Sequence, residues 1–498
     1  MGTTEKFVGI DLGTTTSGLA WVKPDGSPEI VPNGDGERLT PSVVYFDKYE
    51  KVKLVGSSAR DGGDPSRTIF RIKDHMDDPD YVIDFDGEKW TPTEISALIL
   101  AKLKRECERI IGDFEEVVIT VPANFNELAR TATINAAQIA GLKVKRLVNE
   151  PTAAALYYAS TQDIEGRVLV YDMGGGTLDI TILEIAKDKV NILGSEGARR
   201  LGGNNFDDLL LAMYAEQYTA IAGAPLYGDE RERRRCLQLV EDAKKMLSKL
   251  KTVTDTVGNR QVGLARIELT RDVFEEAVQR YLTRTIMLIE QALAGVSLTE
   301  KDIDHVVLVG GSTRIPKVRE VLTKHFGYAP KSCGNVDECV ALGAALFSKN
   351  DREIQEVCNQ SYGILALVED QKTKKSAVKN SIIIKKNRPI PCSESQTYET
   401  SEDNETLIEV DVTQGEDDDP AYVDVIGRLA LKVPSGRPAG CDVKVTYHYD
   451  RDQRVKAMVL DEQTGKSKEV EIEYRGKGVL NAKQVERKSA HLKQVRIE

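Results

Sequence analysis

The sequence predicts a mixed α/β core followed by an all-β unit, and three observations support this. Up to residue 349, apolar β-rich runs alternate with helical periodicity. An apolar run that meets an Asp and turns through Gly and Thr occurs twice, at residues 7–20 and 168–183. After Ser348, helical periodicity nearly disappears and short β-rich runs alternate with turn signals. We therefore expect a duplicated α/β core and an antiparallel β-sandwich behind it.

Composition limits the class of protein. The chain has 498 residues, enough for about three domains. Its net charge of -11 argues against general nucleic-acid binding, which needs a basic surface. No apolar run is long enough to span a bilayer, and the first six residues are too short and polar for a signal peptide. We expect a cytoplasmic protein without membrane partners, whose seven cysteines are reduced core residues rather than metal ligands or disulfides.

The two repeated runs contain turns suited to phosphate: residues 13–16 (the first loop) and residues 174–177 (the second loop). Glycine lets the backbone approach an anion closely, and backbone N–H groups and threonine hydroxyls donate hydrogen bonds to it. Asp11 and Asp172 at the strand ends supply carboxylates for a hydrated Mg²⁺, which needs few protein ligands. One such turn alone is more often a plain hairpin. Its repetition predicts two loops that face one another across a cleft and clamp one polyphosphate.

Periodicity predicts the elements between the loops. Residues 42–46 form a strand, and residues 93–111 carry the apolar face of a helix. Residues 117–121 are a buried strand that stops at Pro122, and a helix follows over residues 127–140. Neither loop opens directly into a helix, which excludes a P-loop and a dinucleotide fingerprint.

The next segment, residues 144–159, is a strand, a turn and a helix. Asn149 is a suitable cap, and Pro151 is tolerated in the first helical turn. Glu150 lies at this junction, where two interpretations stay open: a solvated partner of the helix dipole, or a carboxylate held toward the cleft.

Two later stretches are candidates for the far side of the cleft. A helix over residues 238–250 places three polar side chains on one face, which is usually a solvated stripe. The strand within residues 306–314 ends in two glycines, against which a flat ring could lie, and residues 340–347 form a small-residue helix suited to tight packing.

The C-terminal part begins with a polar linker at residues 350–360. Its expected strands are residues 363–368, 381–385, 407–412, 428–433, 441–449, 455–460 and 470–474.

With these residues in place, the chain resembles the 70-kilodalton heat-shock chaperones of the DnaK type over nearly its whole length. The resemblance rests on the segments GIDLGTTTS, VITVPANFNELAR, KRLVNEPTAAAL, YDMGGGTLDI, LGGNNFDDLL and LVGGSTRIP and on their order. It implies an actin-like (ribonuclease H-like) ATPase domain of two α/β lobes at residues 1–349. The linker at 350–360, a β-sandwich peptide-binding domain at 361–480 and a short helical or disordered tail at 481–498 would follow.

The resemblance also implies roles for single residues. Asp11 and Asp172 would organise Mg²⁺ and its waters, and Asp179 would help to hold monovalent cations such as K⁺. The catalytic residues would be Lys73, Glu150, Asp172 and Thr177. ATP or ADP would be held by Gly13, Thr14, Thr15, Thr16, Gly174, Gly175, Gly176, Thr177, Gly202, Gly203, Glu241, Lys244, Ser248, Gly310, Gly311, Ser312, Arg314 and Asp337.

Lys73 would reach the γ-phosphate and the attacking water, although without the family pattern it is an ordinary surface lysine. Pro122 and Arg130 would relay signals between cleft and linker. The peptide-binding positions would be Ile364, Leu367, Tyr398, Ser401, Ile408 and Val410. Read without the family, each of these is ordinary sandwich core.

Three departures from the family pattern affect these expectations. The stretches 73–90 and 250–269 are short, which puts the use of common nucleotide exchange factors in doubt. The linker lacks an unbroken aliphatic run, so coupling between domains is expected to be weak or different. A helical lid after the sandwich is missing, and a lidless clamp should release peptide fast.

The leading hypothesis is an ATP-hydrolysing, monomeric stress-response chaperone that binds unfolded polypeptides. A J-domain partner would touch Arg146 and Asn149. The alternative is a nucleotide-sensing regulator with weak hydrolysis and one dedicated protein partner. A small-molecule kinase is disfavoured because the sandwich would have no role.

Overall fold

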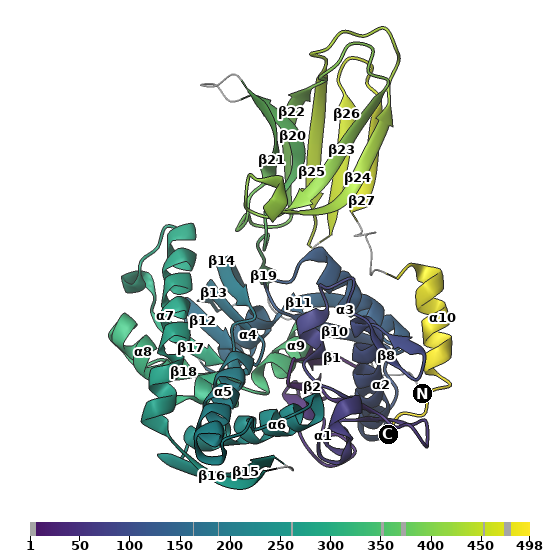
Figure 1. Cartoon of the computed structure of the whole chain (residues 1–498). Helices are drawn as coiled ribbons and strands as arrows, with labels where there is room; N and C mark the ends of the chain where they lie inside the picture. The colour runs from purple at the N-terminus through teal and green to yellow at the C-terminus, as the bar shows by residue number, and fades with distance from the viewer. Residues whose placement is uncertain are drawn as a thin grey trace.

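The structure is a computed structural model that describes residues 6–162, 164–187, 189–259, 262–349, 353–369, 375–451, 454–472 and 480–498 (Figure 1). Its α/β part contains two six-stranded sheets, and its C-terminal part contains two four-stranded sheets. The fold is therefore mixed α/β, with an all-β C-terminal part.

The first sheet has the order β11-β10-β1-β2-β3, with β4 paired to β2. Strand β1 pairs in parallel with β10 and antiparallel with β2, so it is the centre of the sheet. The strands are β1 (Val8–Leu12), β2 (Thr16–Val22), β3 (Pro28–Ile30), β4 (Thr40–Pro41), β10 (Glu116–Val121) and β11 (Lys143–Asn149). Helices α2 (Pro92–Ile111) and α3 (Glu127–Ile139) pack on it through a shared apolar core. We refer to residues 6–149 as the first unit.

Two smaller sheets and a short helix complete the first unit. Their order is β6-β5-β7 in one sheet and β8-β9 in the other. These elements are β5 (Val44–Phe46), β6 (Lys53–Val55), α1 (Ser57–Gly62), β7 (Thr68–Ile69), β8 (Ile83–Phe85) and β9 (Glu88–Trp90).

The second sheet, in the order β18-β17-β12-β13-β14-β19, repeats the pattern of the first. Its central strand β12 pairs in parallel with β17 and antiparallel with β13. The strands are β12 (Gly166–Met173), β13 (Thr177–Ala186), β14 (Lys189–Arg199), β17 (His305–Val309), β18 (Lys331–Ser332) and β19 (Glu353–Gln355). We refer to residues 150–349 as the second unit.

Helices and one hairpin cover the second sheet and extend its core. They are α5 (Gly203–Ala222), α6 (Glu230–Leu247), α7 (Arg271–Gly295), α8 (Pro316–Phe326) and the hairpin β15 (Thr252–Asn259) with β16 (Gly263–Thr270). Helix α6 starts earlier than its periodicity predicts, because the Asp229 carboxylate caps it by accepting from the Glu232 N–H at 2.7 Å. It ends at Leu247, three residues before the predicted end.

Helices α4 (Glu150–Thr161) and α9 (Cys339–Lys349) pack against each other and join the two sheets. Alanine and glycine make this close approach possible. A Cβ at Gly343 of α9 would collide with the Ala153 carbonyl oxygen of α4, and one at Gly9 of β1 would collide with the backbone N of Ala345. The small-residue helix predicted from the sequence thus packs at the junction of the two units.

The C-terminal unit consists of antiparallel sheets in the orders β21-β20-β23-β24 and β22-β25-β26-β27 around one apolar core. Its strands are β20 (Tyr362–Glu369), β21 (Ser376–Ile384), β22 (Cys392–Glu399), β23 (Leu407–Gln414), β24 (Asp424–Lys432), β25 (Asp442–Tyr449), β26 (Val455–Asp461) and β27 (Ser467–Ile472). The sequence did not predict β22, because CSESQTYE has almost no apolar alternation. The predicted strand at 470–474 extends past residue 472, and that part lies outside the described residues.

Part of the linker region, Glu353–Gln355, forms strand β19, and residues 356–360 belong to no named strand. Strand β19 adds to the edge of the second sheet, in parallel with β14 at residues 189–191. The first three linker residues, 350–352, lie outside the described range. A polar sequence can form this strand because an edge strand needs backbone partners more than apolar side chains.

The C-terminal tail folds back onto the first unit. Helix α10 (Ala482–Leu492) packs against α3, and Val485, Leu492 and Ile497 belong to the core of the first sheet. The Lys53 N–H donates to the Arg496 carbonyl at 2.9 Å, so the last residues pair with the edge strand β6. Figure 1 shows α10 beside α2 and α3, away from the C-terminal sheets.

Among the described helices, none combines the length and apolar character needed to cross a membrane.

The packing of the tail predicts a stability effect. Leu492→Ala should destabilise the first unit by about 2–4 kcal/mol, because it leaves a cavity in a shared core. Both tryptophans, Trp21 and Trp90, lie in this unit, so their fluorescence during urea unfolding measures the change. The control is Arg487→Ala, an exposed position on the same helix. Equal urea midpoints for the two variants would contradict the docked tail.

Candidate functional site

The two predicted loops are hairpin turns that face each other. The first joins β1 to β2 and the second joins β12 to β13, each within an antiparallel pair. A Cβ at Gly175 would collide with the Thr15 hydroxyl, and one at Gly176 would lie 3.1 Å from the Thr14 hydroxyl oxygen. Glycine is therefore required where the loops meet. The two loops thus lie against each other, and the polyphosphate clamp between them stays a prediction.

The backbone of both loops is fixed by hydrogen bonds from neighbouring elements. The Ser42 hydroxyl donates to the Gly13 carbonyl at 2.7 Å. In the second loop, the Gly174 carbonyl accepts from the Gly203 N–H at 3.0 Å and from the Ser312 hydroxyl at 2.7 Å. The start of α5 and the turn after β17 therefore hold the second loop in place. This brings Gly203 and Ser312, two predicted nucleotide contacts, to the loop.

A buried ion pair lies beneath the loops. Lys73 Nζ is 2.5 Å from Glu150 Oε1, and the lysine side chain is only 7% exposed. Burial lowers the pKa of Lys73, but the negative charges of Glu150 and Asp11 outweigh this and raise it above its ordinary value. Lys73 is thus a buried, charged lysine, and Glu150, whose side chain is 12% exposed, pairs with it rather than with solvent.

Three aspartates surround this pair. Burial and the charge of Glu150 raise the pKa of Asp11 to about 7, although the Thr120 hydroxyl donates to Asp11 at 2.8 Å. The same two causes raise the pKa of Asp179 to about 7. Burial likewise raises the pKa of Asp172 well above its usual range. Such shifts mean that negative charge at this place lacks compensation in the protein itself.

A cation would supply that compensation. Among the described residues, no group of three or more His, Cys, Asp or Glu side chains is placed to hold a metal together. The carboxylates described above therefore do not suit an ion whose ligands all come from the protein. They do suit a hydrated Mg²⁺, which keeps most of its waters and needs only one or two carboxylates, such as Asp11 and Asp172.

Predicted nucleotide contacts lie together in two groups, the first of which also includes Asp207, a residue that was not predicted. In one, Lys244 Nζ is 2.7 Å from Asp207 Oδ1 and donates to the Gly203 carbonyl at 3.2 Å. In the other, the Arg314 guanidinium donates to Asp337 at 2.5 Å, and a Cβ at Gly311 would lie 3.0 Å from that carboxylate.

The remaining predicted contacts lie on the same elements. Glu241 on α6 pairs with Lys245 at 2.7 Å, and the Ser248 hydroxyl donates to the Lys244 carbonyl at 3.3 Å. Gly202 lies against the second loop, since a Cβ there would be 2.6 Å from the Gly175 carbonyl oxygen. Gly310 has φ +82, and a Cβ on it would be 2.7 Å from Asp172 Oδ1. Glycine is therefore required at this position.

Sequence reasoning missed two cleft residues. Asp74 accepts from the Asn204 amide at 3.0 Å and from the Thr14 hydroxyl at 3.4 Å, which places a carboxylate at the loops. Asn204 belongs to the segment LGGNNF, so its position after two glycines was an available signal. For Asp74, the only signal in the sequence was its position next to Lys73.

Hydrogen bonds join Arg130, one of the two predicted relay residues, to the linker region through Asn149. Arg130 donates to Asn149 Oδ1 at 2.7 Å, and the Asn149 amide donates to Glu356 Oε2 of the linker region at 3.4 Å. Asn149 occupies the cap position of α4 without capping it through its side chain, because these bonds use that side chain. Pro122 accepts from the Phe125 N–H at 3.2 Å. The linker region thus contacts Asn149, the residue that directly precedes Glu150.

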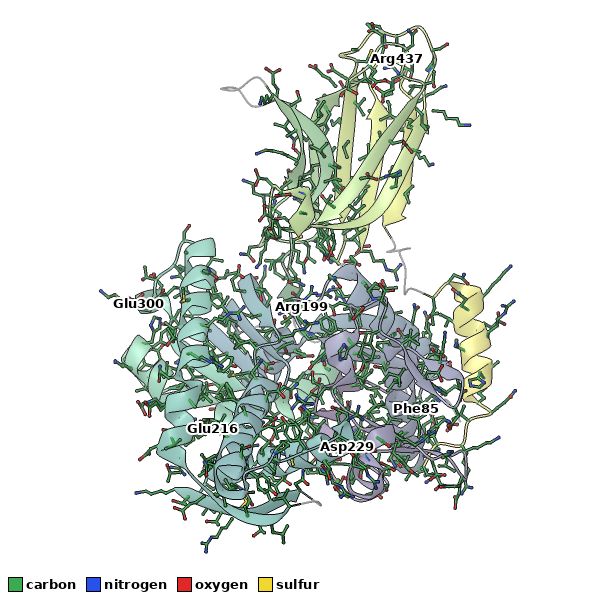
Figure 2. All side chains as sticks on the ribbon, viewed as in Figure 1. Phe85, Arg199, Glu216, Asp229, Glu300 and Arg437 are labelled. Carbon is green, nitrogen blue, oxygen red and sulfur yellow. The ribbon has the colours of Figure 1, made fainter. Side chains whose placement is uncertain are left out.

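Further contacts join the C-terminal unit to both α/β units. The Tyr362 hydroxyl donates to Glu127 at 3.0 Å in the first unit, and Lys386 Nζ is 2.6 Å from Glu196 Oε1 in the second. Arg199 of the second unit, labelled in Figure 2, donates to the Asn124 carbonyl of the first unit at 3.1 Å.

The predicted peptide-binding residues separate into two groups. Ile364, Ile408 and Val410 lie in the core of the C-terminal unit, as the interpretation without the family expects. Leu367 is 61% exposed and Ser401 is also exposed, while the half-buried Tyr398 donates to the Ser381 hydroxyl at 3.0 Å. The structure does not gather the six side chains into one exposed pocket.

The buried aspartates predict a pH dependence of stability. Because the folded pKa of Asp179 is about 7 against an ordinary value of 3.8, the folded state retains the proton more tightly. Its contribution to the free energy of unfolding therefore falls as pH rises from about 4 to about 7. Without magnesium, potassium or nucleotide, Asp179→Asn should melt roughly 3–8 °C above wild type at about pH 8, and the gap should narrow as pH falls and close at about pH 4.

The matched control for this measurement is Asp242→Asn, an exposed position in the same unit. Its melting point should follow wild type at every pH. A gap between Asp179→Asn and wild type that does not change with pH would show that Asp179 is not protonated in the folded state.

Comparison with known families agrees with this geometry. The family model described as Hsp70 protein matches residues 7–497, which is essentially the whole chain. The resemblance drawn from the sequence segments is thereby confirmed, and the chain belongs to the Hsp70 family.

Proposed function

We propose that this protein is a cytoplasmic ATP-dependent chaperone. Its two α/β units would be the lobes of an actin-like ATPase domain, and its C-terminal unit would be a β-sandwich that binds exposed apolar segments of unfolded proteins. The observation that carries the proposal is the arrangement of two facing glycine–threonine loops above the Lys73–Glu150 pair. Family membership supports the ATPase activity and the chaperone role in general.

The residues suit phosphoryl transfer to water. This reaction depends on positioning and charge neutralisation more than on a strong base. The first loop and Thr177 of the second would donate hydrogen bonds to the phosphates. Glu150 fixes the ammonium of Lys73 by a 2.5 Å contact, so the lysine can place its charge on the terminal phosphate and the attacking water. Bound Mg²⁺ would neutralise phosphate charge, with Asp11 and Asp172 holding its waters and Asp179 supporting a K⁺ ion.

Coupling between nucleotide and peptide would run through the linker region. Strand β19 extends the second sheet, and Glu356 contacts Asn149 beside Glu150. A change of cleft geometry would therefore act on the linker directly, although the linker lacks a long aliphatic run. ATP state would in this way modulate the affinity of the sandwich for peptide.

The partners of such a chaperone would be unfolded polypeptides and a J-domain protein. The expected J-domain positions are engaged within the chain: Asn149 is 2% exposed, and Arg146 donates to the Arg451 carbonyl. A J-domain protein would thus have to act when the C-terminal unit has moved away from this surface, or would bind mainly through neighbouring residues.

Single-turnover hydrolysis tests the catalytic assignment. Lys73→Met should slow ATP hydrolysis by about 100-fold to 1,000-fold, because it removes a preorganised charge from the reacting phosphate. Thr177→Ala should slow it less, by roughly tenfold, since one neutral hydrogen bond is lost. Lys89→Met, at an exposed position of the first unit, is the control and should hydrolyse ATP at the wild-type rate. An unchanged rate in Lys73→Met would contradict the assignment.

Peptide stimulation separates a chaperone from a regulator. An extended apolar peptide should accelerate single-turnover hydrolysis severalfold, and a peptide with serine at the apolar positions should not. Leu367→Asp should weaken the stimulation because it charges an exposed apolar position. Tight ATP binding without turnover would instead favour the nucleotide-sensing regulator, and phosphate transfer to a sugar or an acid would favour a kinase.

A further inference from the structure

Asp74 is an acidic side chain in a place built for anions. It belongs to the 3₁₀ turn Ile72–His75, directly after Lys73. While Lys73 reaches Glu150, the Asp74 carboxylate accepts from the Thr14 hydroxyl and the Asn204 amide. Two consecutive residues thus present a cation and an anion to the same cleft.

The carboxylate contacts all three elements that would surround a phosphate. Thr14 belongs to the first loop, and Asn204 lies in the first turn of the 20-residue helix α5. A Cβ at Gly176 of the second loop would collide with Asp74 Oδ1, so the carboxylate oxygen lies against that loop. Hydroxyl and amide groups are donors that suit phosphate oxygens, and here they bind the two oxygens of a carboxylate that lies against the second loop.

We propose that Asp74 is a specificity-determining residue that occupies the position of the terminal phosphate and makes the cleft discriminate against ATP relative to ADP. The inference rests on the proposed nucleotide binding. A γ-phosphate that enters the loops must displace the carboxylate from its donors and then lie near its negative charge. ADP, which lacks that phosphate, leaves the carboxylate in place.

The alternatives for Asp74 are weaker on the same contacts. A purely structural role would need only the Asn204 and Thr14 hydrogen bonds, which an asparagine in the same place can retain in part. A role as a ligand of a metal ion caged by protein side chains would need other carboxylates grouped with it, and the described residues contain no group of three or more potential ligands. Competition between the Asp74 carboxylate and a phosphate is the role that uses both the charge of Asp74 and its position.

Calorimetric titration of wild type and Asp74→Asn with the magnesium complexes of ADP and of a non-hydrolysable ATP analogue tests the inference. Asp74→Asn should tighten binding of the ATP analogue about tenfold or more, because it removes a like charge beside the γ-phosphate. Binding of ADP should change less than about threefold. The ratio of the two affinities is the readout, since a merely structural effect would move both alike.

The control is Asp78→Asn, which makes the same charge change four residues away. Its carboxylate accepts from the Asp80 N–H, and its affinity ratio should match wild type. Asp74→Ser serves as a second variant if Asp74→Asn melts at a lower temperature, and it should shift the ratio in the same direction.

The other outcomes are equally decisive. An unchanged ratio, or weaker binding of the ATP analogue by Asp74→Asn, would overturn the role of Asp74 while leaving the proposed function intact. A wild-type protein that binds neither nucleotide would overturn the proposed function and this inference with it.

Discussion

The structure depends on acidic side chains buried where the first and second units, which have similar sheet topology, meet. Asp11, Asp172, Asp179 and Glu150 surround a single charged lysine, Lys73, with which Glu150 pairs at 2.5 Å. Burial of several carboxylates around one ammonium is costly in a protein alone, because desolvation disfavours the charged forms. The arrangement is reasonable when a cation enters with a ligand, and the raised pKa values of Asp11 and Asp179 are its consequence.

The repetition of one strand pattern explains how this charge is gathered. In each sheet, a central strand carries an aspartate near its end and continues through a tight turn into an antiparallel partner. The contact of α4 with α9 places the two sheets so that these turns oppose each other. The C-terminal unit is connected at both ends: β19 extends the second sheet, and the tail packs into the core of the first. Relative movement of the two α/β units would therefore act on both connections.

The sequence predicted the parts of this structure that have strong local signals. The loops, α2, α3 and most C-terminal strands follow from glycine placement and apolar periodicity. Strand β22 was missed because its packing depends on the neighbouring strand β25 rather than on apolar alternation. The docking of the tail could not be predicted either, since Leu492 and Ile497 meet partners nearly 400 residues away in the sequence.

The residues of the candidate site also divide into those with a local sequence signal and those without one. Glycines of the two loops could be found by their repeated spacing, whereas Lys73 and Glu150 were ambiguous until the family pattern or the fold brought them together. Asp74 and Asn204 were missed because their role comes from contacts across the cleft, between residues 130 positions apart. Ile364, Ile408 and Val410, which the family resemblance gives as peptide-binding positions, lie in the core of the C-terminal unit.

The most direct measurement is a crystal structure of the protein with Mg²⁺ and a non-hydrolysable ATP analogue. Our account predicts the phosphates between residues 13–16 and 174–177, with the magnesium waters on Asp11 and Asp172 and the Lys73 ammonium at the terminal phosphate. Phosphates bound elsewhere, or loops that remain in mutual contact while the nucleotide lies outside the cleft, would contradict it.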